Sequence, residues 1–253
     1  MLTKHGKDFI KLLENIKPSK NRYEIFNDWL VMASAALYSW KKDDAVENEY
    51  LEIVKQYKPE EVDQLSQLLS LTVEALEDQE QDFLGEVFTF AELSNTRNSQ
   101  FFTPYHISYL MAEMAIGEKE LPKNRVCKIN DPCCGAGGML IAGAMVMKKM
   151  GFSFQQDALF IGQDIDPRCA RMTFIQLSLL GVPAVIICGN TITLEMYWQR
   201  ETIGYYMAGM GFRLRAEELI ERVKNLEQAE PEPEQIPIEI MIPRGELVQG
   251  ELF

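Results

Sequence analysis

Residues 130–140 of this chain read NDPCCGAGGML, with an acidic residue, a proline and three glycines packed between two apolar segments. A short apolar run that ends at an acid and several glycines is typical of a buried strand followed by a tight turn into a helix. Gly135, Gly137 and Gly138 also remove side chains where a ligand would need close approach to the backbone. Such a turn also occurs without any ligand, so glycine content alone leaves both interpretations open.

Segments around this turn alternate between strand-like and helical patterns. Short apolar, strand-like runs occupy residues 125–130, 158–166 and 183–191, and helical patterns occupy residues 137–150 and 167–181. Strands that alternate with helices predict right-handed parallel crossovers and a sheet covered on both faces. Open parallel sheets bind ligands beyond the carboxyl ends of their strands, which is where the glycine-rich turn lies. We therefore expect an α/β domain with a candidate binding site at this turn.

The chain before the α/β region has a different pattern. It shows no strand-like alternation before about residue 120, and four segments have helical spacing or helix-start signals: 23–41, 47–57, 58–78 and 82–93. We expect three regions, namely an N-terminal helical domain at residues 1–95, a cofactor-binding α/β domain at 96–228, and a Pro/Glu-rich connector with a C-terminal tail at 229–253.

The formal net charge of −13 argues against a protein that grips DNA by itself, because such proteins usually present a basic surface. Hydrophobic residues make up 47% of the chain and charged residues 25%, which are ordinary globular values and argue against wholesale disorder. Basic residues cluster only near the N-terminus, at Lys4, Lys7, Lys11, Lys17, Lys20 and Arg22. They are candidates for contacts with DNA phosphates, and the alternatives are a solvated helix face or a loose arm.

The five cysteines, an odd number in mostly apolar surroundings, indicate reduced thiols rather than a disulfide framework. The sequence has no Cys-x-x-Cys pair and no Cys/His cluster, so we expect no metal site. No apolar run is long enough to span a bilayer, and the N-terminus lacks a signal-peptide pattern. These features predict a cytoplasmic protein without membrane contact.

Two acidic residues narrow the chemistry of a ligand at the turn. The second expected strand ends at Asp164, where a carboxylate can accept two hydrogen bonds from ribose hydroxyls. The phosphate-binding pattern G-x-G-x-x-G is absent, and Asp131 precedes the glycines instead. An anionic side chain beside the turn suits a ligand with a cationic amine better than a pyrophosphate. S-adenosylmethionine, with its amino acid end and its sulfonium, matches this chemistry.

Four motifs in order resemble the N6-adenine DNA methyltransferases that form the modification subunits of type I restriction systems. DPCCGAGG resembles that family's cofactor motif, and QFFTP at residues 100–104 resembles its lead-in. FIGQDID at residues 160–166 resembles its ribose-binding strand, with Asp164 where glutamate is usual. The third strand ends in Gly-Asn-Thr at residues 189–191, where the family commonly has Gly-Asp-Thr. The likeness covers roughly residues 80–195.

The resemblance implies a Rossmann-like, S-adenosylmethionine-dependent methyltransferase fold preceded by an α-helical domain that fits the family more loosely. Only about forty residues follow Phe212, so we expect the parallel sheet to be truncated. The implied cofactor is S-adenosylmethionine. The implied cofactor-binding residues are Phe101, Phe102, Thr103, Pro104, Asp131, Pro132, Cys134, Gly135, Gly137, Asp164, Ile165 and Asn190.

The resemblance breaks at the catalytic turn. The family carries Asn/Asp-Pro-Pro-Phe/Tyr after its fourth strand, where the polar side chain and a carbonyl orient the flipped adenine and the aromatic ring stacks on it. No such tetrapeptide occurs in this sequence. Spacing puts Gly209, Met210, Gly211 and Phe212 at that position, so the stacking ring remains while the amide acceptor and both prolines are lost.

Three hypotheses follow from this combination. The first is an N6-adenine DNA methyltransferase-like protein that binds S-adenosylmethionine, is catalytically impaired, and meets DNA weakly or through a specificity subunit or a methyltransferase-like partner. The second is an active adenine-specific DNA methyltransferase with a divergent catalytic turn. The third is a non-enzymatic interaction protein that keeps the fold. Cofactor binding separates the third from the others, and a methylation assay separates the first from the second.

Overall fold

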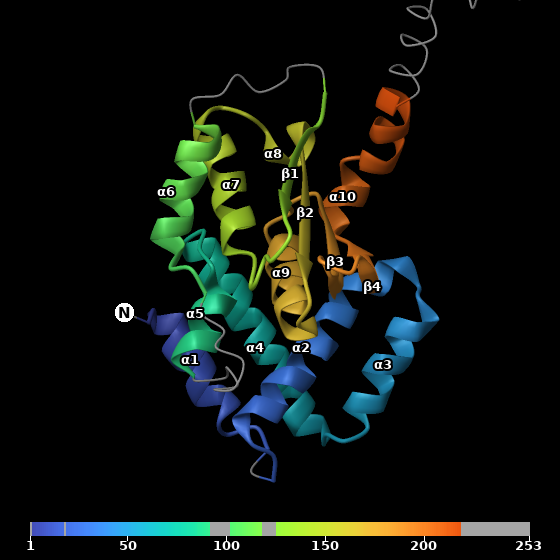
Figure 1. The fold of residues 1–253 in the computed structure, drawn as a ribbon. Coiled ribbons are helices and arrows are strands. Elements are labelled where there is room, and N and C mark those ends of the chain that lie inside the picture. Colours follow the sequence, from blue (N-terminus) through green and yellow to red (C-terminus); the bar gives the residue numbers. More distant parts are fainter. Residues whose placement is uncertain (1, 18, 92–101, 118–124, 219–253) are drawn as a thin grey trace, which may run out of the picture. The chain divides into compact units, whose positions relative to one another are not determined.

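The computed structural model describes residues 2–17, 19–91, 102–117 and 125–218 of the chain (Figure 1). Residues 1–217 form one compact unit, and the remaining residues are assigned to a second unit. The first unit contains α1 to α10 and β1 to β4, whose bounds are given below.

The N-terminal region folds into helices, and short polar side chains cap the starts of most of them. These helices are α1 (Lys4–Leu13), α2 (Arg22–Tyr38) with a short 3-10 turn η1 (Ser39–Lys41), α3 (Asp44–Val54), α4 (Pro59–Asp78) and α5 (Phe83–Phe90). Asn21 and Glu24 form a reciprocal capping box at the start of α2, and Asp43 and Asp82 cap α3 and α5. The helices expected from sequence spacing are therefore confirmed, with ends that differ by a few residues.

The N-terminal basic residues do not form a loose arm. Lys4, Lys7 and Lys11 lie on α1, an ordered helix that buries Phe9 and Leu13 completely in the core. This amphipathic helix follows from the spacing of its apolar residues and from Thr3, whose side chain accepts a hydrogen bond from the Gly6 N–H at its start.

The sheet has four strands in the order β1-β2-β3-β4, namely β1 (Cys127–Asp131), β2 (Ala158–Asp164), β3 (Ala184–Asn190) and β4 (Glu195–Glu201). The first three strands pair in parallel, which confirms the predicted alternation of strands and helices in a Rossmann-like α/β arrangement. β4 runs antiparallel to β3, with a register shift at Cys188 and Gly189. The sequence had not indicated this strand, because its turn-proximal residues, which include Met196 and Tyr197, are exposed and its second half is mostly charged or polar.

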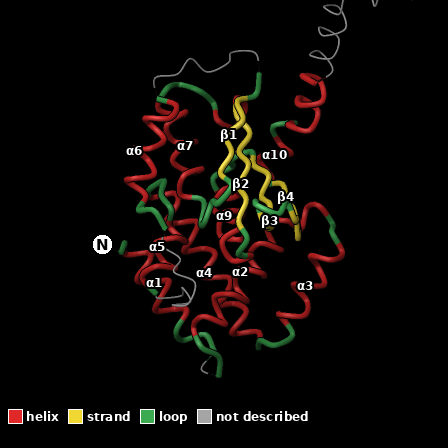
Figure 2. The backbone as a smooth tube through the Cα atoms, viewed as in Figure 1, coloured by secondary structure: helices red, strands yellow, loops and turns green. Residues whose placement is uncertain are grey.

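Helices connect the parallel strands and pack against the sheet, and a further helix packs against one of these connecting helices (Figures 1 and 2). α7 (Gly138–Lys149), α8 (Phe154–Asp157) and α9 (Pro167–Leu179) connect the parallel strands, and α6 (Tyr105–Ile116) packs against α7. α9 contacts the sheet and also packs against α2 of the helical region. One hydrophobic core thus contains Phe9 and Trp29 from the helical region together with Phe160 and Phe174 from the α/β region.

α10 (Ile203–Met207) and the helical residues after it lie on the other face of the sheet. Met210 packs there with Val126 and Leu159, at the starts of β1 and β2. The helical and α/β regions share one core within the compact unit, and the expected boundary near residue 95 stays a prediction. The carboxyl ends of β1, β2 and β3 therefore lie at the opposite end of the sheet from this cluster.

Candidate functional site

The turn after β1 needs glycine for its own geometry. Gly135 has φ +55° and Gly137 has φ +98°, both in the region that side chains disfavour. A Cβ atom at Gly135 would lie 3.0 Å from the ring of Phe102, and one at Gly137 would lie 3.1 Å from the side chain of Thr173. The glycines therefore have a structural reason as well as the functional one suggested by the sequence.

Hydrogen bonds tie this turn to the neighbouring strand and helix. The Cys134 N–H donates to the Gln163 carbonyl at 2.9 Å, so the turn continues along the end of β2. Thr173 on α9 donates its hydroxyl to the Gly135 carbonyl at 2.8 Å, and its oxygen lies 3.4 Å from the Cys134 sulfur. Burial raises the pKa of the Cys134 thiol, which keeps it neutral and makes it a packing element of the turn.

Asp131 and Asp164 lie at the ends of adjacent strands and flank the turn. Asp164 accepts hydrogen bonds from the Gly135 N–H on one oxygen and from the Asp166 N–H on the other, both at 2.9 Å. Asp131 accepts from the Cys133 N–H at 3.1 Å. Each carboxylate oxygen has a further lone pair, so both groups can still accept from a ligand. Burial raises the pKa of both carboxyls, and the negative charges of Asp166 and Asp131 raise the pKa of Asp164 further.

The end of β3 joins the same place. The Thr191 hydroxyl donates to the Pro132 carbonyl at 2.7 Å, which links the third strand to the turn after the first. Asn190 uses its side-chain oxygen to accept from the Ile192 and Thr193 N–H groups at 2.9 and 3.2 Å. Ile165, just beyond β2, is 57% exposed at this edge. The structure thus gathers the predicted residues of all three strand ends.

The lead-in segment meets the turn through one aromatic ring. Phe102 packs over Gly135 and also contacts Phe88 of α5, with ring centroids 5.3 Å apart. Thr103 and Pro104 follow it, are exposed, and lead into α6. Phe101, the other aromatic candidate of this segment, lies outside the described residues. Contact of Phe102 with the turn agrees with the sequence expectation, and its role toward a ligand stays a prediction.

The four residues placed on the catalytic turn by spacing lie elsewhere. Gly209 has φ +62° in the turn between α10 and the helical residues that follow, so no strand leads into it. Met210 is fully buried beside the starts of β1 and β2, and Phe212 is 79% exposed. In this fold the segment is at the amino end of the parallel strands. β4 and α10 occupy the stretch that was expected to lead into a fourth parallel strand.

The structure adds supporting residues that sequence analysis had not singled out. Gln176 on α9 donates from its amide nitrogen to Asp82 and to the Ala136 carbonyl, both at 2.8 Å, and accepts from the Leu84 N–H at 3.0 Å. Asp82 also accepts from the Gly85 N–H, which caps α5. The only sequence signal was the position of Asp82 at a helix start. The pairing of Asp82 with Gln176, 94 residues away, has no local signal.

Within residues 2–17, 19–91, 102–117 and 125–218, no group of three or more His, Cys, Asp or Glu side chains is arranged to hold a metal ion. None of the helices in these ranges is both long enough and apolar enough to cross a lipid bilayer.

Comparison with known proteins finds a family model and a curated relative that match parts of the chain. The model of the N-6 DNA Methylase family matches residues 79–236, more than half of the chain. The Type I restriction enzyme MpnII methylase subunit of Mycoplasma pneumoniae is 26% identical over an alignment of 147 residues, which covers 55% of this chain and 26% of that protein. The chain thus spans about a quarter of the length of this curated relative.

A solved structure also matches in part. It is the type I restriction-modification system methyltransferase subunit from Streptococcus thermophilus, at 18% identity and a TM-score of 0.36, over 69% of this chain and 36% of that one. A TM-score this low supports no detailed comparison of the two folds.

Proposed function

We propose, from the premise that this chain belongs to the N-6 DNA methylase family, that it binds S-adenosylmethionine at the carboxyl ends of β1, β2 and β3. One observation carries the proposal: Asp131 and Asp164 flank the glycine turn, and the Gly135 N–H is bonded to the Asp164 carboxylate. This arrangement puts two acceptors beside a turn whose backbone a ligand can approach.

Different residues of the site bind different parts of the cofactor. Asp164 accepts the ribose hydroxyls through the lone pairs that its two backbone hydrogen bonds leave free. Asp131 and the turn from Gly135 to Gly138 hold the amino acid end. Asn190, whose oxygen already serves two backbone N–H groups, is left with its amide N–H groups to donate to the adenine ring. Bound S-adenosylmethionine supplies an electrophilic methyl group.

Methyl transfer is the second part of the proposal. The 253-residue chain transfers methyl groups to DNA adenine slowly or not at all when it acts alone. Attack by the adenine amine needs two acceptors that hold its protons while its lone pair faces the sulfonium. The sequence contains no Asn/Asp-Pro-Pro-aromatic segment, and Gly209 to Phe212 lie away from the turn. A specificity subunit or a methyltransferase-like partner brings DNA and the missing acceptors.

Cofactor binding is tested by calorimetry with S-adenosylmethionine on the wild-type chain and on Asp164→Ala. Loss of charged hydrogen bonds to ribose costs about 1.5 to 3 kcal/mol, so the variant should bind about tenfold more weakly or worse. Asp157→Ala, just before the other end of β2, serves as the control and should bind normally. Equal binding by Asp164→Ala and wild type would refute the ribose assignment, and no binding by either would favour the non-enzymatic interaction protein.

Transfer is tested by incubating the chain with DNA and methyl-labelled cofactor. We expect a rate at least about a thousandfold below that of a complete enzyme, because orientation of the amine contributes several kcal/mol. Rapid adenine methylation by the chain alone would favour the alternative of an active enzyme with a divergent turn. Replacing Gly209, Met210 and Gly211 by Asn-Pro-Pro should not restore activity, because this segment does not face the cofactor turn.

A further inference from the structure

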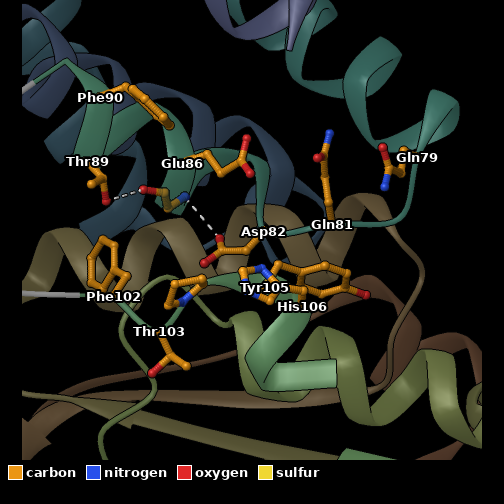
Figure 3. Close-up of a pocket in the computed structure, with 12 residues that line it drawn as sticks. Gln79, Gln81, Asp82, Glu86, Thr89, Phe90, Phe102, Thr103, Tyr105 and His106 are labelled. Atoms are coloured by element: carbon orange, nitrogen blue, oxygen red, sulfur yellow. Dashed lines mark hydrogen bonds between the residues drawn. The ribbon is translucent and has the colours of Figure 1, made fainter. Parts of the chain in front are cut away.

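A cavity of about 420 Å³ lies between α5 and the start of α6, beside the glycine turn (Figure 3). Aromatic rings of Phe90, Phe102 and Tyr105 form part of its wall, and two carboxyl groups, those of Asp82 and Glu86, line it as well. None of the described residues that line the cavity is a lysine or an arginine. The cavity is thus negatively charged and partly aromatic.

The two carboxyl groups differ in how they are satisfied. Asp82 is 4% exposed and accepts hydrogen bonds from the Gly85 N–H and from Gln176. Glu86 lies one helical turn later, and its Oε2 atom is buried without a hydrogen-bond partner among the described residues. A buried carboxylate oxygen that lacks a partner is costly, and such groups are normally paired. Burial raises the pKa of both Asp82 and Glu86.

Two side chains, those of Phe102 and Asp82, lie against both the cavity and the glycine turn. Phe102 lines the cavity and packs over Gly135, where a Cβ atom would lie 3.0 Å from its ring. Asp82 Oδ2 would lie 3.0 Å from a Cβ atom at Gly138, where α7 begins. The glycines of the turn therefore back directly onto the cavity wall.

We propose that Glu86 accepts a hydrogen bond from the ammonium group of the cofactor's amino acid end, inside this cavity. The inference rests on the proposed binding of S-adenosylmethionine at the turn. Carboxylates and aromatic faces both stabilise a cation, and charge-assisted hydrogen bonds of this kind are strong. The ammonium group has three N–H donors, so a bond to Glu86 leaves donors for Asp131. The first N–H groups of α7 suit the cofactor's carboxylate.

A matched pair of ligands tests this assignment. S-adenosylmethionine carries the amino acid end, whereas 5′-methylthioadenosine keeps the adenosine part and lacks that end. Glu86→Gln should weaken binding of S-adenosylmethionine about tenfold or more. The same variant should bind 5′-methylthioadenosine within about twofold of wild type. Glu80→Gln removes an exposed carboxyl that pairs with Lys148 on the outside and should change neither affinity.

The outcomes separate this inference from the proposed function. If wild type binds S-adenosylmethionine and Glu86→Gln binds it equally well, the inference is wrong while the cofactor site stands. If wild type binds neither ligand, the cofactor site itself is wrong. Equal weakening of both ligands would also overturn the inference, because it would indicate a general change in the site. Glu86→Asp keeps the charge but shortens the side chain, and should weaken only S-adenosylmethionine by a smaller factor.

Discussion

At the residue scale, three carboxyl groups lie around the glycine turn. The burial of each group disfavours its charged form. Burial raises the pKa of Asp82, Asp131 and Asp164. Backbone N–H groups and Gln176 donate hydrogen bonds to these carboxyl groups, which offsets part of the free-energy cost of burying them. Perturbed carboxyl pKa values are common at functional sites, and a cation bound beside these groups would favour their charged form.

Asp82→Asn should change how stability depends on pH. The pKa of Asp82 is raised on folding, so between its unfolded value, about 3.9, and its folded value the folded state binds more protons. Wild type therefore loses stability as pH rises through this window, and Asp82→Asn, whose oxygen can accept the same two hydrogen bonds, does not. Thermal unfolding between pH 4 and 7 should show that the melting temperature of the variant increases relative to that of wild type as pH rises.

A matched surface change provides the control for this experiment. Asp63→Asn replaces an exposed carboxyl on α4, so it reports the effect of a lost surface charge alone. A difference between wild type and Asp82→Asn that stays constant across the pH range would contradict the argument from burial.

At the scale of elements, the turn between β1 and α7 is shaped by its neighbours as much as by its own residues. Thr173 and Gln176 of α9 hold the Gly135 and Ala136 carbonyls, and the ring of Phe102 closes over Gly135. The turn therefore depends on the docking of α9 and of the lead-in segment. A glycine in such a turn should be harder to replace than one in an open turn.

Gly137→Ala and Gly181→Ala test this dependence as a pair. Both glycines have positive φ, +98° and +65°, but a Cβ atom would lie 3.1 Å from Thr173 at Gly137 and would meet nothing within 4 Å at Gly181. Gly181→Ala should cost about 1 to 2 kcal/mol for its backbone conformation alone. Gly137→Ala should cost about 1 to 3 kcal/mol more, because the added methyl group overpacks the contact.

Urea unfolding measures both changes through the shift of the midpoint at unchanged slope. Equal losses at the two positions would show that contacts around the turn contribute little and that conformation alone matters there.

The charge distribution belongs to the scale of the whole molecule. The chain carries a net charge of −13, and three of its six N-terminal basic residues are engaged in polar contacts within the fold. Lys20 pairs with Asp28, Arg22 lies 3.4 Å from Glu14, and Lys17 donates to the Gln56 carbonyl. Lys4, Lys7 and Lys11 remain exposed on α1. Removal of residues 1–22 is not a clean test of them, because Phe9 and Leu13 belong to the core.

DNA binding by the isolated chain should be weak and should fall steeply with salt. Each phosphate contact contributes about 0.9 to the slope of log affinity against log salt, so replacing Lys4, Lys7 and Lys11 by glutamine should lower the slope by up to about three. Fluorescence anisotropy with labelled duplex DNA at several salt concentrations measures this. Replacement of Lys41, Lys42 and Lys55, outside α1, should leave the slope nearly unchanged. Tight binding that persists at high salt would contradict the electrostatic account.

The sequence by itself determined the parts of this protein that depend on local spacing. The strand ending at Asp131, the glycine turn and the strand ending at Asp164 could be predicted because each pattern lies within a few consecutive residues. Parallel pairing then brings the strand ends together whatever the surrounding helices are, which is why Asp131, Asp164 and Asn190 meet as expected.

Only the tertiary structure decided the features that depend on contacts between distant segments. Gly209 to Phe212 look like a catalytic turn by spacing, yet an antiparallel β4 and the packing of Met210 on Val126 and Leu159 carry them to the amino end of the sheet. The hydrogen bonds of Asp82 with Gln176 have no local pattern at all, and neither does the Glu86 oxygen that has no hydrogen-bond partner among the described residues. Burial and pairing of this kind arise only when helices far apart in the chain pack together, so no window of sequence contains them.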